Sequence, residues 1–393
     1  MRQAVFLNDL GIVCALGRGR TEVAARLFAG DGEGMIRTDA FSPGRPLVVG
    51  RVQAALPEAP PALAGSSRNS RLLWAAAQEL LDSLDRWRGR VGPDRIATVV
   101  GTSIAGIPEA EQAIRALRHT GSLPRGFHYR QQELGSAAHA LAEALHLAGP
   151  AYTVSTACSS GAKALASAAR LLRLGACDAA VAGGSDALCA LTVAGFSALE
   201  SISPDRCNPF SRNRNGINLG EGAALFLMTR EPAEVRLLGV GESSDAHHIT
   251  APDPSGAGVL DAMREALCRA ALAPEDLDYL NLHGTGTVQN DAMEARVVHE
   301  LFGPETPCSS TKPLTGHTLG GAGAIEAAFC YLTLAPENRA HRLPPHLWDG
   351  IRDPALAPLG FAAAGACAPR LTHCLSSSFA FGGSNTVVVL GRG

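Results

Sequence analysis

A cysteine in the setting of a nucleophile lies in the stretch AYTVSTACSSGAKALASAARLLRL, Ala151 to Leu174. The residues just before Cys158 are β-branched or aromatic and favour a strand. Those after it are rich in Ala and Leu at helical spacing, and they predict a helix that ends at Gly175. Cys158 therefore falls at the start of a helix, where backbone N–H groups stabilise a thiolate and can donate to an oxyanion. An inert buried cysteine would give the same local pattern.

Three further stretches carry groups that could complete a catalytic site. LHGTGT places His283 at the end of a predicted strand. STKPLTGHTLGGAGAIE places His317 in a glycine-rich turn, five residues after Lys312, with Glu326 in the helix that follows. SFAFGGSN, Ser378 to Asn385, is a tight turn able to present a backbone N–H. Alone, each has a structural alternative: His317 could cap a helix, and Glu326 could pair with an arginine.

The elements that must position these groups alternate between strands and helices. In the first half we expect strands at Ala4 to Leu16, Arg95 to Gly101, Asp178 to Gly183 and Ala223 to Met228, and helices at Thr21 to Ala29, Arg71 to Leu84 with Ser70 as its cap, Pro108 to Leu117 and Ser136 to Leu147. Phe41 to Ser67 reads as a Pro/Gly-rich link, and residues 196–222 as a turn-rich segment.

The second half repeats the alternation. We expect strands at Val235 to Gly241, Tyr279 to Leu282 and Cys308 to Thr311, helices at Val259 to Ala271, Asp291 to Leu301 and Leu319 to Leu334, and a hairpin of Thr372 to Ser378 with Thr386 to Leu390. Two halves of similar order indicate duplicated α/β layers. All four chemical stretches follow predicted strands, and active sites of open α/β sheets gather at the carboxyl ends of strands.

Composition narrows the class of protein. The net charge of −3 argues against nucleic-acid binding. The 10 cysteines include no C-x-x-C pair, so neither a zinc site nor a disulfide framework is indicated, and a cytoplasmic location is expected. No apolar run reaches the ~18 residues of a membrane span. Among 34 basic residues the only lysines are Lys163 and Lys312.

Six spaced motifs, taken together, resemble the β-ketoacyl-acyl carrier protein synthases of the thiolase superfamily, in their elongating form. The motifs are TACSSG at Cys158, NLGEGA at Glu221, HGTGT at His283, STKPLTGH through Lys312 and His317, GGAGAIE at Glu326, and FAFGGSN at Phe381. The resemblance implies an α/β protein with a five-layer αβαβα fold built from two similar halves, which we place at residues 1–230 and 231–393. It also implies a dimer.

The reaction implied by the resemblance is a decarboxylative Claisen condensation of an acyl thioester with malonyl-acyl carrier protein. Cys158 would carry the acyl group, and its own N–H with that of Phe381 would form the oxyanion hole. His283 and His317, as neutral imidazoles, would donate N–H groups to the malonyl thioester oxygen. Lys312 and Glu326 would hold the histidines. No metal or cofactor is implied, since the substrates travel on phosphopantetheine.

Substrate contacts follow from the same resemblance. Thr285 and Thr287 would contact the phosphopantetheine or malonyl unit. Ile104, from the partner subunit, would close the tunnel for the growing chain. Phe381 would gate the tunnel, and Phe196 is a further substrate-binding candidate.

Docking of an acidic carrier protein needs a local basic patch. The candidates are Arg68, Arg71, Arg206, Arg212 and Arg214. A solvated arginine-rich face is the alternative reading.

Departures from the fatty-acid enzymes point to a narrower group. Lys163 and Glu200 replace a histidine and a basic residue that are common there. SISPDRCNPFSRNRNGINLGEGA, HGTGTVQNDAMEA and LPPHLWDGIRDPALAPL look more like the synthases of aryl polyene pigment clusters. The partner would then be a second copy or a related chain-length subunit, and a housekeeping fatty-acid synthase remains the alternative.

Other classes lack their signatures. A thiolase would need a second cysteine in the C-terminal turn, and FAFGGSN has none. A starter-unit synthase usually has Asn in place of the second histidine. A non-catalytic chain-length subunit generally lacks the nucleophile, whereas this chain keeps Cys158. A papain-like protease has a different cysteine signature.

Overall fold

The sheet of this protein is built from two half-sheets of the same design. The computed structural model describes residues 3–63 and 65–393. The first half-sheet contains β1 (Val5–Cys14), β8 (Gly222–Thr229), β7 (Ala179–Asp186), β5 (Ile96–Gly101) and β6 (Ala151–Val154), in that spatial order. The second contains β9 (Val235–Ser244), β14 (Ser384–Arg392), β13 (His373–Phe379), β10 (Tyr279–Asn281) and β11 (Pro307–Ser309), with the short β12 (Gly360–Phe361) at its edge.

Strand directions repeat as well as strand order. In each half the first two pairings are antiparallel and the next two are parallel. β1 also pairs antiparallel with β9, which joins the halves into one sheet. The predicted construction from two similar halves is confirmed. The chain passes from one half to the other between Thr229 and Val235.

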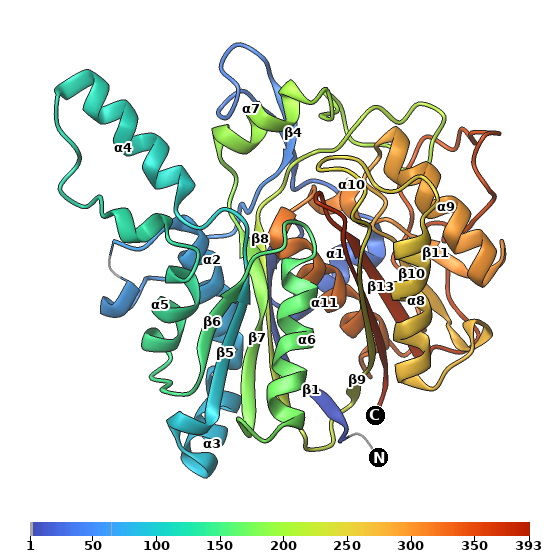
Figure 1. Ribbon diagram of the computed structural model, residues 1–393, viewed down its shortest axis with the longest axis horizontal. Coiled ribbons are helices and arrows are strands. Elements are labelled where there is room, and N and C mark those ends of the chain that lie inside the picture. The colour runs from blue at the N-terminus through green and yellow to red at the C-terminus, as the bar shows by residue number, and fades with distance from the viewer. Residues whose placement is uncertain (1–2, 64) are drawn as a thin grey trace.

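Helices cover both faces of the half-sheets and fill the space between them (Figure 1). α2 (Arg68–Ala77), α3 (Leu81–Val91) and α5 (Ser136–Ala144) cover the first half-sheet, and α8 (Ala257–Ala270) and α9 (Val288–Phe302) cover the second. α6 (Ser160–Arg173) and α11 (Ala322–Leu334) pack on each other between them, with α1 (Arg20–Ala29) against α11. Every residue of α11 is buried, as expected for a helix that is apolar on all sides.

Some local predictions were wrong. Ser67, not Ser70, caps α2: its side chain accepts the N–H of Ser70 while its own backbone stays extended. Both serines fit the capping rule, and the start of the apolar face did not decide between them. The predicted link hides β4 (Leu47–Gly50), which pairs with β3 (Met35–Thr38). α7 (Ala190–Ala198) overlaps the segment read as turn-rich.

α4 (Ile107–Thr120) and the segment after it project from the body (Figure 1). Ile114, Leu117, Leu123 and Tyr129 on this projection are all more than two-fifths exposed. Within residues 3–63 and 65–393, no helix combines the length and apolar character needed to cross a bilayer.

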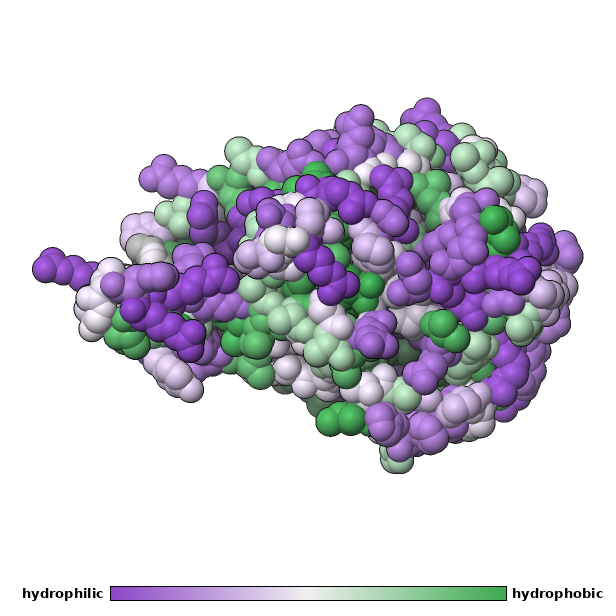
Figure 2. Space-filling view, turned by 90° about the horizontal axis from the view of Figure 1, so that it is seen from above, coloured by the Kyte–Doolittle hydropathy of each residue, from purple (hydrophilic) through white to green (hydrophobic). Residues whose placement is uncertain are grey.

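The carboxyl ends of the parallel strands all point to the top of Figure 1. Figure 2 looks down on this face, where hydrophobic side chains gather in the middle among hydrophilic ones. The turns that follow β6, β10, β11 and β13 therefore lie close together, as the sequence predicted.

Candidate active site

Cys158 lies in a tight turn between β6 and α6. Ala157, just before it, has a φ of 50°, a left-handed conformation that is unusual for a residue with a Cβ. The Ser160 side chain holds the turn, since its Oγ accepts the Thr156 N–H at 2.8 Å and donates to the Ala157 carbonyl at 2.6 Å. The start of α6 also packs tightly on α11, because a Cβ on Gly161 would lie 2.7 Å from the Ala324 nitrogen.

His317 is brought directly to the cysteine. Its Nε2 lies 3.0 Å from the Cys158 sulfur. The ring follows a turn at Gly316, whose φ of 67° suits glycine, and the His317 N–H donates to the Asn218 carbonyl at 2.7 Å. The His317 Nδ1 is buried and has no hydrogen-bond partner within the described residues.

His283 is held by a carboxylate that the sequence did not single out. Glu294 of α9 accepts the backbone N–H groups of His283 and Gly284, both at 2.7 Å. Ser377 also accepts the His283 N–H, at 3.1 Å. The rings of His283 and His317 meet edge to face, with centroids 5.2 Å apart. Glu294 lies 11 residues after His283, and only the packing of α9 on this turn reveals its role.

Lys312 and Glu326 form a buried ion pair behind the histidines. The Lys312 ammonium donates to Glu326 Oε1 at 2.5 Å and to the His283 carbonyl oxygen. It also lies 3.5 Å from the His283 Nδ1. The Glu326 Oε2 has no partner among the described residues. Lys312 therefore contacts His283, one of the two histidines that the resemblance expected it to hold, and no hydrogen bond joins it to His317 within the described residues.

The electrostatics of the site keep all three reacting groups neutral. Burial lowers the pKa of His283 and His317 well below 6.5, and the nearby Lys312 charge lowers both further. Burial raises the pKa of the Cys158 thiol to about 12, against the opposing effects of Lys312 and the Phe381 N–H. Loss of solvent therefore opposes the stabilisation that a helix start gives a thiolate, and it favours the protonated thiol here.

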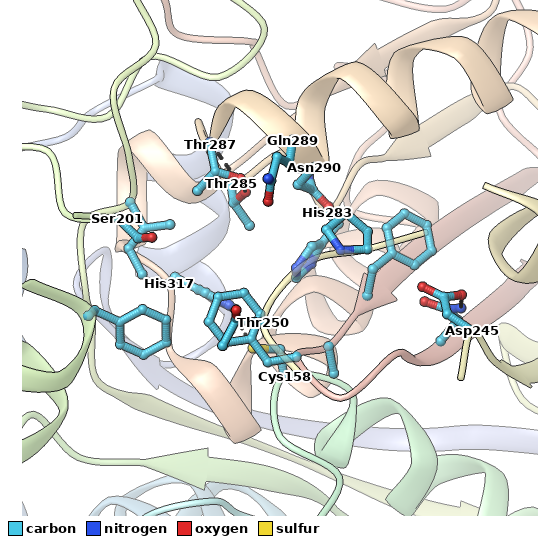
Figure 3. A pocket seen from close by; sticks show the side chains of 17 residues that line it. Cys158, Ser201, Asp245, Thr250, His283, Thr285, Thr287, Gln289, Asn290 and His317 are labelled. Atoms are coloured by element: carbon cyan, nitrogen blue, oxygen red, sulfur yellow. Dashed lines mark hydrogen bonds between the residues drawn. The ribbon is translucent and has the colours of Figure 1, made fainter. Parts of the chain in front are cut away.

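One pocket contains four of the five predicted substrate contacts, and Ile104 is not among the residues that line it (Figure 3). Cys158, His283 and His317 face the same space. Thr285 and Thr287 line it with their hydroxyls 3.0 Å apart. Further lining residues that the sequence did not indicate are Ser201, Asp245, Thr250, Gln289 and Asn290. No group of three or more potential metal ligands occurs in residues 3–63 and 65–393.

Two phenylalanines narrow the pocket. The rings of Phe196 and Phe381 lie 5.5 Å apart and both line it. They come from α7 and from the turn after β13, so the pocket wall combines both halves of the chain.

Ile104 is buried in an apolar cluster of its own subunit. It is 4% exposed and lies in the apolar cluster that contains Cys158, Leu188 and Val193. The buried carboxylate of Asp186 accepts the Ile104 N–H at 3.0 Å, together with those of Ser103 and Gly320. Within its own subunit Ile104 therefore packs in the cluster that contains Cys158, and its place at the partner's tunnel stays a prediction.

Two of the five candidate docking arginines are occupied inside the protein. Arg68 donates twice to the buried carboxylate of Glu221, at 2.7 and 2.5 Å. The Arg214 side chain is 6% exposed and pairs with Asp353 at 2.5 Å. The docking role predicted for Arg214 was wrong, because its paired and buried guanidinium cannot meet a second protein. The Arg68 side chain is 31% exposed, so its docking role stays a prediction, although Glu221 already holds its guanidinium. The remaining candidates are exposed: Arg71, Arg206 and Arg212.

Comparisons with known proteins agree along the whole chain. Residues 53–233 match the family model "Beta-ketoacyl synthase, N-terminal domain", and residues 234–346 match "Beta-ketoacyl synthase, C-terminal domain". The chain is 31% identical over 422 residues to "3-oxoacyl-[acyl-carrier-protein] synthase 2" of Coxiella burnetii, covering 100% of this chain and 99% of the relative.

Solved structures show the same likeness. The ketosynthase ApeO, solved in complex with its chain length factor ApeC from Xenorhabdus doucetiae, is 42% identical with a TM-score of 0.93, covering 100% of this chain and 98% of that one. The ishigamide ketosynthase/chain length factor is 27% identical with a TM-score of 0.88, covering 100% and 99%.

Proposed function

Because this chain belongs to the β-ketoacyl synthase family and condenses an acyl thioester with malonyl-acyl carrier protein, we propose that Cys158, His283 and His317 divide that reaction into two stages. The observation that supports this division is the meeting of one buried thiol and two neutral imidazoles in a single pocket. We also propose that residues 1–230 supply the nucleophile and residues 231–393 supply both histidines.

In the first stage Cys158 attacks the acyl thioester. Since the thiol is protonated at neutral pH, its proton must leave as the carbon–sulfur bond forms. The His317 Nε2, 3.0 Å from the sulfur, is placed to accept it and to pass it to the departing carrier thiol. The N–H groups of Cys158 and Phe381 stabilise the oxyanion. The bond to the carrier sulfur breaks, and the acyl group remains on Cys158.

In the second stage malonyl loses CO₂, and the electrons of the broken carbon–carbon bond form an enolate. Negative charge then develops on the thioester oxygen, where His283 and His317 donate N–H groups. The enolate carbon attacks the acyl group on Cys158, the bond from the acyl carbon to the Cys158 sulfur breaks, the sulfur regains a proton from water, and the 3-oxoacyl product leaves. Because Nε2 is the ring atom that lies against the sulfur, His317 holds a lone pair there in the first stage and an N–H there in the second, so the neutral ring changes tautomer between them.

Lys312 and Glu326 act through the histidines. The Lys312 ammonium donates to the His283 carbonyl, and its charge adds to the effect of burial, which is the main reason that both imidazoles stay neutral. Glu326 stabilises that ammonium in a buried place where an unpaired charge would be very unfavourable.

We propose that the acyl group is a rigid polyene and that the partner is a related chain-length subunit. Support comes from the aryl polyene-like segments and from the two ketosynthases solved with chain length factors. A conjugated chain has few rotatable bonds. A narrow apolar tunnel beside the cluster that contains Ile104 and Val193 would therefore bind it with little loss of conformational entropy.

The acidic carrier protein, with its phosphopantetheine arm, would dock beside Arg71, Arg206 and Arg212. A reducing cytoplasm would suit the 10 cysteines, none of which forms a disulfide within the described structure.

Housekeeping fatty-acid elongation is the second candidate, favoured by the likeness to the Coxiella enzyme. Competition between 2,4-dienoyl and saturated carrier-protein substrates of equal length decides between them, with and without a co-expressed partner. The proposal expects preferential extension of the dienoyl substrate. A clear saturated preference by the protein alone would leave the fatty-acid reading.

A further inference from the structure

A third buried histidine, His346, lies behind the Lys312 segment. Its Nδ1 accepts the Ser310 N–H at 3.1 Å, and its Nε2 lies 3.2 Å from the Pro209 carbonyl oxygen. A backbone N–H can only donate and a carbonyl can only accept, so the proton of this ring is on Nε2. The ring is 5% exposed and stacks on Phe361 with centroids 4.1 Å apart. One tautomer in one orientation therefore satisfies both nitrogens.

The Ser310 side of this bond leads to the segments that carry His283 and Lys312. Ser310 Oγ donates to the Gly284 carbonyl at 2.6 Å, next to His283. The same oxygen accepts the Lys312 N–H at 3.4 Å. Ser310 thus links His346 to the two segments whose side chains meet at the His283 carbonyl.

The Pro209 side completes a ring of hydrogen bonds around the turn after His283. The next residue, Phe210, has a left-handed φ of 61° and donates its N–H to Asp291 at 2.7 Å. Asp291 also accepts the Gly286 N–H at 3.2 Å. The residues of this hydrogen-bond ring are tightly packed, because a Cβ on Gly284 would lie 2.6 Å from the Ser310 side chain.

We infer that His346 is a positioning residue, which fixes His283 and Lys312 through Ser310 and Pro209 without touching the substrate. The inference rests on the proposed roles of His283 and Lys312. Burial lowers the pKa of His346 to about 3, so the ring stays neutral at every working pH. Cys158 and His317 make no hydrogen bond to this ring, so acyl transfer to Cys158 should not depend on it.

Two variants separate positioning from simple stability. His346→Leu fills the space without an acceptor for Ser310, whereas His346→Asn offers an amide oxygen near the place of Nδ1. A small displacement of a catalytic group can reduce a rate by up to about 10²-fold, so we expect His346→Leu to slow CO₂ release from malonyl-carrier protein at least ~10-fold. Acylation of Cys158, read by intact mass, should change less than ~2-fold, and His346→Asn should recover most of the CO₂ release.

His299→Leu is the matched control. The His299 Nδ1 also lies near a proline carbonyl, that of Pro358 at 2.9 Å, but the contact is exposed and outside the ring described above. This variant should match wild type in both half-reactions. If His346→Leu does not fold, His346→Asn is compared with His346→Gln, whose amide reaches the Pro209 side. Positioning through Ser310 requires the Asn variant to release CO₂ faster than the Gln variant.

Wild-type CO₂ release by folded His346→Leu would overturn the inference, as would equal loss of acylation and CO₂ release without rescue by Asn. Failure of the proposed function looks different. In that case wild-type protein would fail to release CO₂ from malonyl-carrier protein, or His283→Ala would release it at the wild-type rate. Neither result requires a His346 variant.

Discussion

Replacement of His317 by alanine should separate the two stages by their pH dependence. With a thiol pKa of about 12, the thiolate fraction of Cys158 at pH 8 is about 10⁻⁴, because 12 − 8 is four pH units. Wild-type protein avoids this limit, since the neutral His317 takes the proton. Its acylation rate should stay nearly constant from pH 6.5 to 9, where an imidazole of lowered pKa is already neutral.

In His317→Ala the thiol must ionise unaided. Acylation of Cys158 should then rise about tenfold per pH unit from pH 7 to 9. Release of CO₂ should fall about 10²-fold or more at every pH, because one oxyanion-type donor is missing and hydroxide cannot replace it. Intact-mass kinetics measure the first rate and trapped CO₂ the second.

His283→Ala is the control for this experiment. No hydrogen bond joins its ring to the sulfur in the described structure, so its acylation should follow the flat wild-type profile while CO₂ release is lost. The reasoning would be refuted if His317→Ala acylated at the wild-type rate without pH dependence, or if it released CO₂ normally.

Three further outcomes are expected. Ile104→Phe should shorten the products, measured by mass spectrometry of the carrier-bound chains, because Ile104 lies in the apolar cluster beside Cys158; an unchanged distribution would mean that other residues end the tunnel. Lys312→Met should lower the free energy of unfolding in urea by about 3–5 kcal/mol, because Glu326 would lose the one hydrogen-bond partner that the described residues give it, whereas Lys312→Met with Glu326→Gln should recover part of that loss; a double variant no more stable than the single would contradict the pairing. Burial raises the pKa of Glu294 to about 7, so the native state keeps a proton that the unfolded state loses above pH 4.5; wild-type stability should therefore fall as pH rises from 4.5 to 7, and Glu294→Gln should remove that part of the slope in urea titrations at pH 5 and 7.5.

The parts of the site that could be predicted are those whose residues follow strands. His283 directly follows a predicted strand, Cys158 and His317 lie within six residues of the end of one, and parallel strands bring their carboxyl ends to one edge. The order and spacing of the motifs also matched a known family over the whole chain, and this match assigned roles to the three residues.

The parts that could not be predicted bind backbone groups far away in the chain. Asp186 accepts N–H groups from Ser103 and from Gly320, 134 residues later. His346 likewise accepts the Ser310 N–H, and it donates to the Pro209 carbonyl. A buried acceptor of this kind leaves no periodic pattern, since its partners are present in every residue type except proline.

Charge states were the other source of error. The position of Cys158 at a helix start argues for a thiolate, and the opposing loss of solvent follows only from the structure, in which α11 and His317 pack against the turn. The pairing of Arg68 could not be predicted either, because its partner Glu221 lies 153 residues away.

The central claim, that Cys158 carries the acyl group which malonyl then extends, is tested by intact-mass spectrometry of the protein in two steps. Incubation with acyl-carrier protein should add the acyl mass to wild type and not to Cys158→Ala. Addition of malonyl-carrier protein should then remove that mass, with release of CO₂ and formation of a 3-oxoacyl-carrier protein two carbons longer. A Cys158→Ala protein that gains the acyl mass, or a wild-type adduct that malonyl-carrier protein does not discharge, would contradict the account.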